Sequence, residues 1–384
     1  MTVNELDIEG TSTLGGGTVA RALVIKNTRV GNIEFPHRLL TGTDLFHAKQ
    51  VIGENNRLTI SFQSQIYGIN RSYDQPRLEA ITRSKSVYEK ELTTVTSSAN
   101  KKRDAFRVLL PNIQPDVKIS DANEERLLQV QKGNDAVVML DSNDLSINQL
   151  ANRVRDGLKT ISEFEGHKLA LLRVSMSQRK AIVEAKLDLA FSTSGIEGVI
   201  IPYANPEYAY SKIALLRRYA TIPKWIHMQG IPKYSANDGK TSLMHLLAMY
   251  GIDSFSLKAY PHFNPTEPPD VKRLDWGSLA YLDFPNEHRQ RYENRVECST
   301  NCPPDYKATV NDIVDTYSPE KLPSYTRVHE AYESQFGFFT IRNRILGEKR
   351  ALFDLIKSKD IGRTLLHEWE GIDFEGKMMV NKRL

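Results

Sequence analysis

The stretch EERLLQVQKGNDAVVMLD, residues 124–141, places a helix directly before a strand. Apolar side chains recur at helical spacing over 124–132, whereas AVVML at 136–140 is apolar at every position. A strand that is apolar on both faces is typical of a parallel sheet covered by helices. The stretch therefore indicates one strand-and-helix repeat of an α/β protein.

Apolar or β-branched runs of the same kind recur along the chain. They lie at 38–43, 58–64, 106–110, 169–174, 198–201, 224–228 and 252–257. Helical patterns fill most of the gaps, at 77–95, 147–164, 179–191, 207–219 and 242–250. This alternation predicts a (β/α)8 TIM barrel, with a doubly wound open sheet as the alternative.

The rhythm of strands and helices also sets the expected domain boundaries. Residues 1–21 are polar and turn-prone, with Gly15, Gly16 and Gly17 in a row, and predict a flexible N-terminal arm before a barrel core over 22–260. Four prolines between Pro261 and Pro269 open an irregular stretch, so we expect an inserted subdomain over 261–330, after the eighth strand. Helical periodicity then returns, and 331–384 is expected to complete the barrel.

The composition is that of a folded protein. Of 384 residues, 40% are hydrophobic and 26% are charged, which excludes collagen-like and mainly disordered chains. No run approaches the ~18 consecutive apolar residues of a membrane span, and MTVNELDIEG lacks the features of a signal peptide, so we expect a cytoplasmic protein with no membrane partner. The net charge of +4 permits a polyanionic partner without requiring one.

Polar residues follow several of the predicted strands, at the end of a barrel where active sites form. Asp141 ends AVVMLD, Asp44 follows LLTGT, Ser175 ends ALLRVS, and Asp253 and Ser256 lie in GIDSFSLKAY. Each of them can instead cap the next helix. Ser142, Asn143 and Asp144 offer that cap beside Asp141, which leaves Asp141 available to contact a ligand.

The two cysteines of the chain suggest a metal site. Cys298 and Cys302 lie four positions apart in ECSTNCPPD, which also supplies Asp305, and His329 stands in the helical run RVHEAY. Thiolates, a carboxylate and an imidazole are donors that hold structural Zn²⁺. Reduced thiols beside an ordinary surface histidine are the alternative, and His288 is an alternative donor.

Five segments carry a resemblance to a known family. They are KNTRVGNIEFPHRLLTGT (26–43), ANEERLLQVQKGNDAVVMLD (122–141), WIHMQGIP (225–232), AMYGIDSFSLKAY (248–260) and RVHEAYESQFGFFTIRNRILGEKR (327–350). In this order they resemble the tRNA-guanine transglycosylases. These are zinc-containing barrels that exchange guanine in RNA for a 7-deazaguanine base, with a branch that modifies DNA. The resemblance covers nearly the whole chain.

The resemblance implies a role for each candidate residue. Asp141 would recognise the Watson–Crick edge of the target base, and Cys298, Cys302, Asp305 and His329 would hold the zinc. Ser256 stands where the family has its nucleophilic aspartate, so Asp253 is expected to take that role, with Asp44 or Asp141 transferring the proton. The base pocket is expected at Ser175, Met176, Tyr203, Gln229, Gly230 and Ser256.

Three functions follow from these expectations. The first is a base-exchange glycosyltransferase that puts a 7-deazaguanine base into tRNA or DNA by a retaining two-carboxylate mechanism. It requires Asp141 and Asp253 to converge in one cleft. The second is an inactive transglycosylase-like barrel that binds nucleic acid or supports a catalytic partner, because the nucleophile position is Ser256. The third is an unrelated barrel enzyme. The resemblance also implies a homodimer, or a heterodimer with a related subunit.

Overall fold

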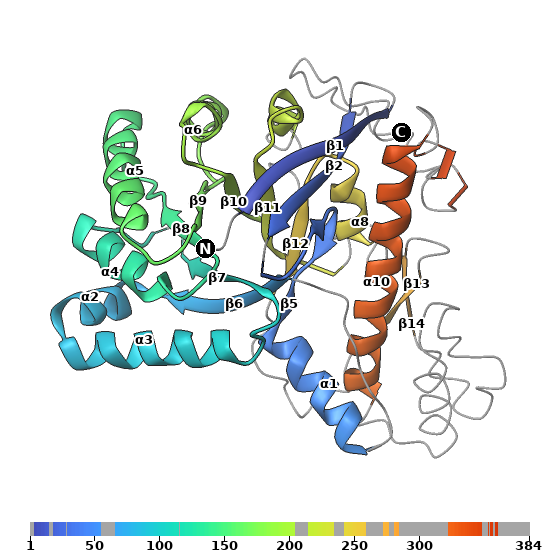
Figure 1. Ribbon diagram of the computed structural model, residues 1–384, viewed down its shortest axis with the longest axis horizontal. Coiled ribbons are helices and arrows are strands. Elements are labelled where there is room, and N and C mark those ends of the chain that lie inside the picture. The colour runs from blue at the N-terminus through green and yellow to red at the C-terminus, as the bar shows by residue number, and fades with distance from the viewer. Residues whose placement is uncertain are drawn as a thin grey trace, which may run out of the picture.

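The short apolar runs form strands that pair in parallel in chain order. In the computed structural model, nine strand segments make one sheet in the order β4-β12-β11-β10-β9-β8-β7-β6-β5. Segments β4 (His37–Arg38) and β5 (Leu40–Thr41) belong to one first strand, and they pair with β12 and β6 respectively. The sheet therefore closes through the first strand (Figure 1). The predicted α/β barrel of TIM type is confirmed.

The structure describes residues 4–14, 18–27, 29–54, 66–114, 116–203, 214–233, 242–258, 272–275, 280–283 and 322–347, with a few positions between 352 and 359. The other barrel strands are β6 (Ile66–Tyr73), β7 (Phe106–Ile113), β8 (Ala136–Leu140), β9 (Leu169–Arg173), β10 (Gly198–Pro202), β11 (Trp225–Ile231) and β12 (Ser254–Leu257). The helical elements around them are α1 (Gly42–Glu54), α2 (Gln75–Arg83), α3 (Lys85–Asn100), α4 (Asp121–Gln131), α5 (Ile147–Ser162), α6 (Lys180–Ser192), the 3₁₀ helix η2 (Ala214–Tyr219) and α8 (Leu243–Ala248).

Two predicted elements differ from those observed. The second strand of the barrel is β6 (Ile66–Tyr73), whereas the run predicted for it at 58–64 lies outside the described residues. The helix predicted over 77–95 is divided into α2 and α3 at Ser84. Ser84 has an extended backbone, ends α2 and caps α3, because its Oγ accepts a hydrogen bond from Val87 N.

The segment predicted to be a flexible arm is instead ordered into strands. β1 (Asn4–Leu14) pairs antiparallel with β2 (Thr18–Asn27), and β3 (Ile33–Glu34) adds to the far edge of β2. The alternation of Glu5, Leu6, Asp7 and Ile8 is that of a half-buried strand, and the two apolar residues pack against the core. The described part of the segment predicted as an arm over 1–21, residues 4–14 and 18–21, thus lies in strands.

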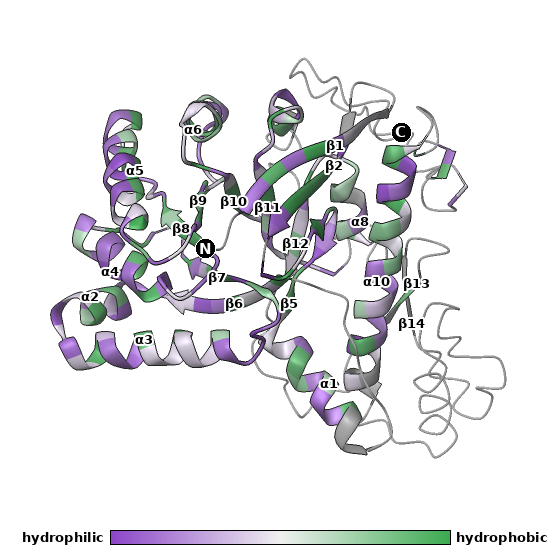
Figure 2. Cartoon of the chain, in the orientation of Figure 1, coloured by the Kyte–Doolittle hydropathy of each residue, from purple (hydrophilic) through white to green (hydrophobic). Residues whose placement is uncertain are grey.

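Alternate side chains of the barrel strands pack on opposite sides of the sheet. Val137 and Met139 of β8 belong to an apolar cluster with residues of α5 and α6. Val138 and Leu140 of the same strand belong to a second cluster, formed with residues of β7 and β9 in the barrel interior. Figure 2 shows green and purple alternating along α3 and α5, as expected of helices with one apolar side. The core thus has one layer within the barrel and another between barrel and helices.

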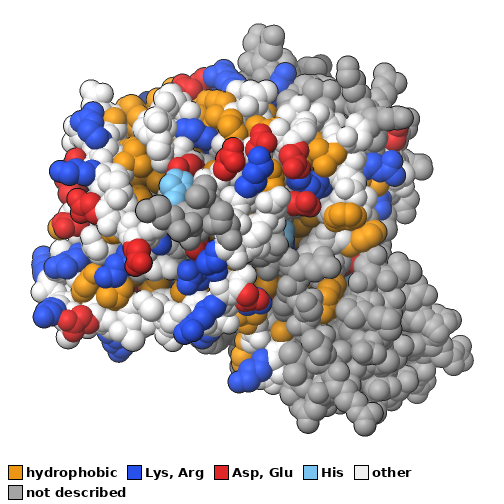
Figure 3. Space-filling model, viewed as in Figure 1, with side chains coloured by type: hydrophobic (Ala, Val, Ile, Leu, Met, Phe, Trp, Pro, Cys, Tyr) orange, Lys and Arg blue, Asp and Glu red, His pale blue; other side chains and the backbone are white. Residues whose placement is uncertain are grey.

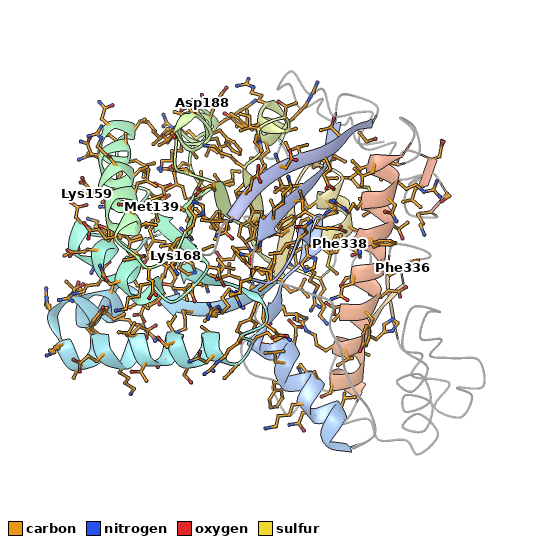
Figure 4. The ribbon with its side chains drawn as sticks, in the orientation of Figure 1. Met139, Lys159, Lys168, Asp188, Phe336 and Phe338 are labelled. Atoms are coloured by element: carbon orange, nitrogen blue, oxygen red, sulfur yellow. The ribbon has the colours of Figure 1, made fainter. Side chains whose placement is uncertain are left out.

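The long helix α10 (Leu322–Leu346) packs against α1 and the strands of the first part of the chain. Phe338 points from α10 toward the barrel, whereas Phe336 points away (Figure 4). The Phe338 ring stacks on Phe255 of β12 with their centroids 5.5 Å apart. The helix begins within the segment assigned to the insertion. It also contacts β13 (Lys272–Asp275), which pairs with β14 (Ala280–Asp283).

Within the described residues, none of the helices combines the length and apolarity that a membrane crossing requires. On the face drawn in Figure 3, Lys and Arg side chains are interspersed with Asp and Glu. The charged residues of this face therefore do not form a patch of a single sign.

Candidate site at the carboxyl end of the barrel

Most of the predicted site residues gather at one end of the barrel. Asp44 and Asp141 follow β5 and β8, and Ser175, Met176 and Tyr203 follow β9 and β10. Gln229, Gly230 and Ser256 lie near the ends of β11 and β12. Because the strands are parallel, these positions all lie on the carboxyl side, where barrel enzymes have their sites.

Asp253 lies at the opposite end. It precedes β12, and its two carboxylate oxygens accept hydrogen bonds from Arg21 of β2. One of them also accepts from Ile226 N at 2.6 Å. Both side chains of this ion pair are fully buried. Asp253 and Asp141 therefore do not converge in one cleft, and this placement speaks against the nucleophilic role expected of Asp253.

Asp141 is held by a lysine that the sequence reasoning missed. Its two carboxylate oxygens lie 2.6 and 2.7 Å from Nζ of Lys186, which comes from α6. Both side chains are fully buried. Burial raises the pKa of Asp141, and the ammonium group of Lys186 opposes that rise. The carboxylate is thus engaged on the helix side of β8 and is not open toward the barrel interior.

Asp44 is part of a buried ion network beside α10. Its Oδ1 accepts from Arg38 at 2.6 Å and from Arg327 at 2.7 Å, and Oδ2 accepts from Thr41 N and Oγ1 at 2.8 Å. Burial alone would raise the pKa of Asp44, but the two guanidinium groups and Thr41 hold it well below its usual range. A carboxylate that stays ionised can accept a proton but does not donate one, so this environment is compatible only with the base direction of the predicted proton transfer.

Ser256 lies in a chain of buried hydrogen bonds on the inner face of β11 and β12. Trp225 Nε1 donates to Ser254 Oγ at 2.7 Å, Ser254 Oγ lies 2.8 Å from His227 Nδ1, and His227 Nε2 lies 3.1 Å from Ser256 Oγ. Burial lowers the pKa of His227 to about 3. A neutral His227 that is hydrogen-bonded on both ring nitrogens is a weak proton acceptor for the Ser256 hydroxyl.

Two inward-facing side chains reach across the barrel mouth to the end of β7. Arg173 Nη2 donates to Ile113 O at 3.1 Å, and Gln229 Nε2 donates to Pro111 O at 3.3 Å. Both side chains are buried, and neither Arg173 Nε nor Gln229 Oε1 has a hydrogen-bond partner among the described residues. Among the described residues, Arg173 Nε and Gln229 Oε1 are thus a buried donor and a buried acceptor without partners, both on side chains that reach the same strand end.

Arg173 also supplies positive charge at this mouth. Burial lowers the pKa of Arg173 to about 10, and Asp141 opposes this shift. The guanidinium group remains charged at neutral pH. The sequence analysis did not predict Arg173, Lys186 or His227 as site residues. Arg173 could have been found, because it is the one charged residue in the otherwise apolar strand LALLR.

The remaining predicted pocket residues have different environments. Met176 is 2% exposed and packs within the apolar cluster between barrel and helices. Ser175 is half-buried with its Oγ 2.8 Å from Ser177 Oγ. Tyr203 is half-buried and its N–H donates to Gln229 O at 2.8 Å. Gly230 has a φ of 72°, which favours glycine, and its N–H donates to Ser256 Oγ at 3.3 Å.

Only one of the four predicted zinc ligands lies within the described residues. Cys298, Cys302 and Asp305 lie outside them. His329 is buried on α10, and its Nε2 donates to Leu274 O of β13 at 2.9 Å. With Nε2 as the donor of this bond, the lone pair of a neutral imidazole is on Nδ1. Zinc ligation by His329 stays a prediction.

Comparisons with known proteins add no assignment. No protein-family model matches the chain, and no curated protein matches it. Within the described ranges, no three His, Cys, Asp or Glu side chains cluster as a metal site would require.

Proposed function

We propose that this chain is a transglycosylase-like barrel that binds a nucleobase of tRNA or DNA at the carboxyl end without exchanging it. The observation that carries the proposal is the pair of unused polar atoms at the mouth, Arg173 Nε and Gln229 Oε1. A base edge presents donors and acceptors side by side, so it is a suitable partner for one donor and one acceptor over the same strand end. The base would have to leave its stack to reach them.

The geometry of the acids favours binding over exchange. Retaining base exchange needs a nucleophilic carboxylate and a second group that moves a proton, both close to the sugar. Asp253 is bound to Arg21 at the far end of the barrel, Asp141 is bound to Lys186, and Asp44 is ionised between two arginines. Among the described candidates, the role left for the chain is that of a nucleic-acid-binding protein or a partner subunit of a catalytic relative.

The proposal includes a structural zinc site in the insertion after the eighth strand. Cys298, Cys302, Asp305 and His329 would hold Zn²⁺, which would stabilise the fold of that insertion. The hydrogen bond from His329 to Leu274 O supports this ligand set, because it orients the imidazole. The same region would supply the contact in a homodimer or in a heterodimer with a related subunit.

The proposal is tested by measuring binding and exchange on the same protein. Fluorescence anisotropy with labelled tRNA and labelled duplex DNA reports binding, and incorporation of labelled guanine reports exchange. We expect binding without incorporation, and about tenfold weaker binding by Gln229→Met, because its acceptor is lost. Gln129→Met, a half-buried position on α4, is the matched control and should bind as wild type. Absence of binding by the wild type would refute the proposal.

A second function, base exchange with a 7-deazaguanine base, is favoured by one observation. Asp44 and Asp141 lie on the same carboxyl side as Ser256, as a catalytic set would. Incorporation of labelled guanine by the wild type and by Asp144→Asn would establish exchange, and its loss in Asp141→Asn would assign Asp141 to it if circular dichroism shows that this variant is folded. Asp144 is an exposed acid of the same loop and controls for the loss of one charge.

A further inference from the structure

A second feature of the carboxyl end is a pocket of about 670 Å³ beside the barrel mouth. It is bordered by the ends of β6 and β7 and by α2 and α3, which lie next to β6 in Figure 1. Among its lining residues are Arg71, Arg77 and Lys90, together with Glu91, Asp74 and Asn112. The charged lining residues comprise three cations and two carboxylates, so the pocket carries a net positive charge.

Glu91 holds the two arginines in place. It accepts from Arg71 Nε at 2.9 Å, from Arg71 Nη2 at 2.7 Å and from Arg77 Nη2 at 2.6 Å, and Tyr73 OH donates to it at 2.9 Å. Its side chain is 5% exposed. Burial would raise the pKa of Glu91, but the bonds from Arg71 and Arg77 lower it, so it is ionised. A buried carboxylate with three donor side chains fixes the directions of both guanidinium groups.

The arginines keep donors for a ligand. A guanidinium group has five N–H donors, of which Arg71 uses two and Arg77 uses one toward Glu91. Arg77 also lies over the Tyr73 ring, 5.5 Å from its centroid. Lys90 is exposed and its ammonium group makes no ion pair within the described chain. The unused N–H groups and this ammonium are the donors that an oxyanion requires.

The pocket adjoins the mouth through the end of β7. Asn112 lines the pocket, and its Nδ2 lies 3.4 Å from Ser72 Oγ of β6. The carbonyl of the preceding residue, Pro111, accepts the hydrogen bond from Gln229 at the mouth. One strand end thus separates the two sites. A nucleotide whose base occupied the mouth would have its sugar and phosphate close to this pocket.

We infer that the pocket binds a phosphate group of the nucleic acid, through Arg71, Arg77 and Lys90. The inference deepens the proposed function and rests on it for the source of the phosphate. Arg forks match phosphate oxygens in pairs, and the net positive charge disfavours cations and adds attraction for an anion. The carboxylate of Glu91 has the separate role of positioning the arginines and makes no contact with the phosphate.

The test uses two double variants that remove equal charge. Arg77→Gln/Lys90→Gln removes pocket cations. Arg83→Gln/Lys85→Gln removes exposed cations of α2 and α3, which pair only with Glu79 and Glu89 of the same helices. Binding of a fluorescein-labelled single-stranded DNA, and of the same sequence as RNA, is measured between about 50 and about 200 mM salt. Lys90→Gln alone is measured as well. Lys90 is exposed, so this variant should fold normally and any weaker binding by it reports the lost charge.

We expect the pocket double variant to bind about tenfold more weakly, with a salt slope smaller by about one, and the control to bind as wild type. If both double variants bind as the wild type does, the pocket inference is overturned and the proposed function stands. If the wild type binds neither oligonucleotide, the proposed function fails. Titration with inorganic pyrophosphate then tests the pocket inference independently of nucleic-acid binding. Pyrophosphate binding that is lost only in the pocket double variant supports a pocket for free phosphates. If the wild type does not bind pyrophosphate, the pocket inference is overturned.

Discussion

Arg21 and Asp253 form a fully buried ion pair at the amino end of the barrel, opposite the candidate site. Arg21 also donates to the carbonyls of Tyr219, Ile222 and Lys224, so one side chain ties β2 to the segment before β11 and to the start of β12. Both oxygens of the Asp253 carboxylate are therefore engaged in the wall of the barrel, away from its carboxyl end.

The first prediction concerns the stability that this pair provides. Arg21→Met leaves the Asp253 carboxylate buried without its counter-ion, and we expect a loss of about 3–5 kcal/mol in the free energy of unfolding. Lys26→Gln, on the same strand but with an exposed ion pair, should change it by less than about 1 kcal/mol. Urea unfolding measures both. Equal small losses would show that Arg21 and Asp253 are not coupled.

A second prediction concerns the contribution of the buried ion pair between Asp141 and Lys186 to stability. Asp141→Asn and Lys186→Met each leave one buried partner uncompensated and should each destabilise the fold by about 3–5 kcal/mol. The double variant Asp141→Asn/Lys186→Met removes both charges, so we expect its loss to be well below the sum of the single losses. A double-mutant cycle from thermal unfolding gives the coupling, and additive losses would contradict the observed contact.

The third prediction is a pH dependence from His227. Burial lowers its pKa from 6.5 to about 3 in the folded chain. Below pH 6.5 the unfolded chain takes up a proton that folded His227 does not, so this contribution to stability is lost as the pH falls from 6.5 toward 3. The loss amounts to about 1.4 kcal/mol per pH unit. In His227→Gln, the slope of unfolding free energy against pH should be shallower by that amount.

The control for the histidine experiment is His167→Gln, because the His167 side chain is 47% exposed. Unfolding free energies at about pH 6 and about pH 5 suffice for the comparison. His167→Gln should keep the wild-type slope. The assignment of His227 as a buried neutral imidazole is wrong if His227→Gln keeps that slope as well.

A fourth prediction tests how closely two barrel strands approach. A Cβ at Gly198 would lie 2.3 Å from Trp225 O and 2.9 Å from Leu171 Cδ2. Gly198→Ala should therefore destabilise the fold by about 1–3 kcal/mol or more, since neither strand can move without disturbing the ladder. A Cβ at Gly133 meets nothing within 4 Å, so Gly133→Ala should change stability by less than about 0.5 kcal/mol. Thermal unfolding distinguishes the two.

The fifth prediction concerns the proposed zinc site. Purified protein should contain about one zinc per chain by elemental analysis, and His329→Ala should lose it, because one of four ligands is removed. His167→Ala, at an exposed histidine away from α10, should retain the metal. Zinc retained by His329→Ala would exclude this histidine from the ligand set, and zinc absent from the wild type would refute the site.

The barrel could be predicted from sequence because its signal is local. Each buried strand, such as Ala136–Leu140, is a short apolar run, and each helix repeats its apolar residues at its own period. The hairpin of β1 was missed because its alternation of charged and apolar residues was outweighed by the glycines that follow it. The division of the helix at Ser84 was not predicted, because the apolar residues before and after Ser84 both recur at helical spacing. A single serine between them gave no clear sign of a break.

The sequence by itself placed Asp44, Asp141 and Ser256 at the carboxyl end of the barrel, since strand order and direction follow from the alternating pattern. Only the tertiary structure decided what these side chains do. Lys186 meets Asp141 from 45 residues away, and Arg21 meets Asp253 from 232 residues away. Periodicity reports which face a residue occupies, but the partner of a buried charge is set by packing between distant elements, and that partner decides whether the charge can act on a ligand.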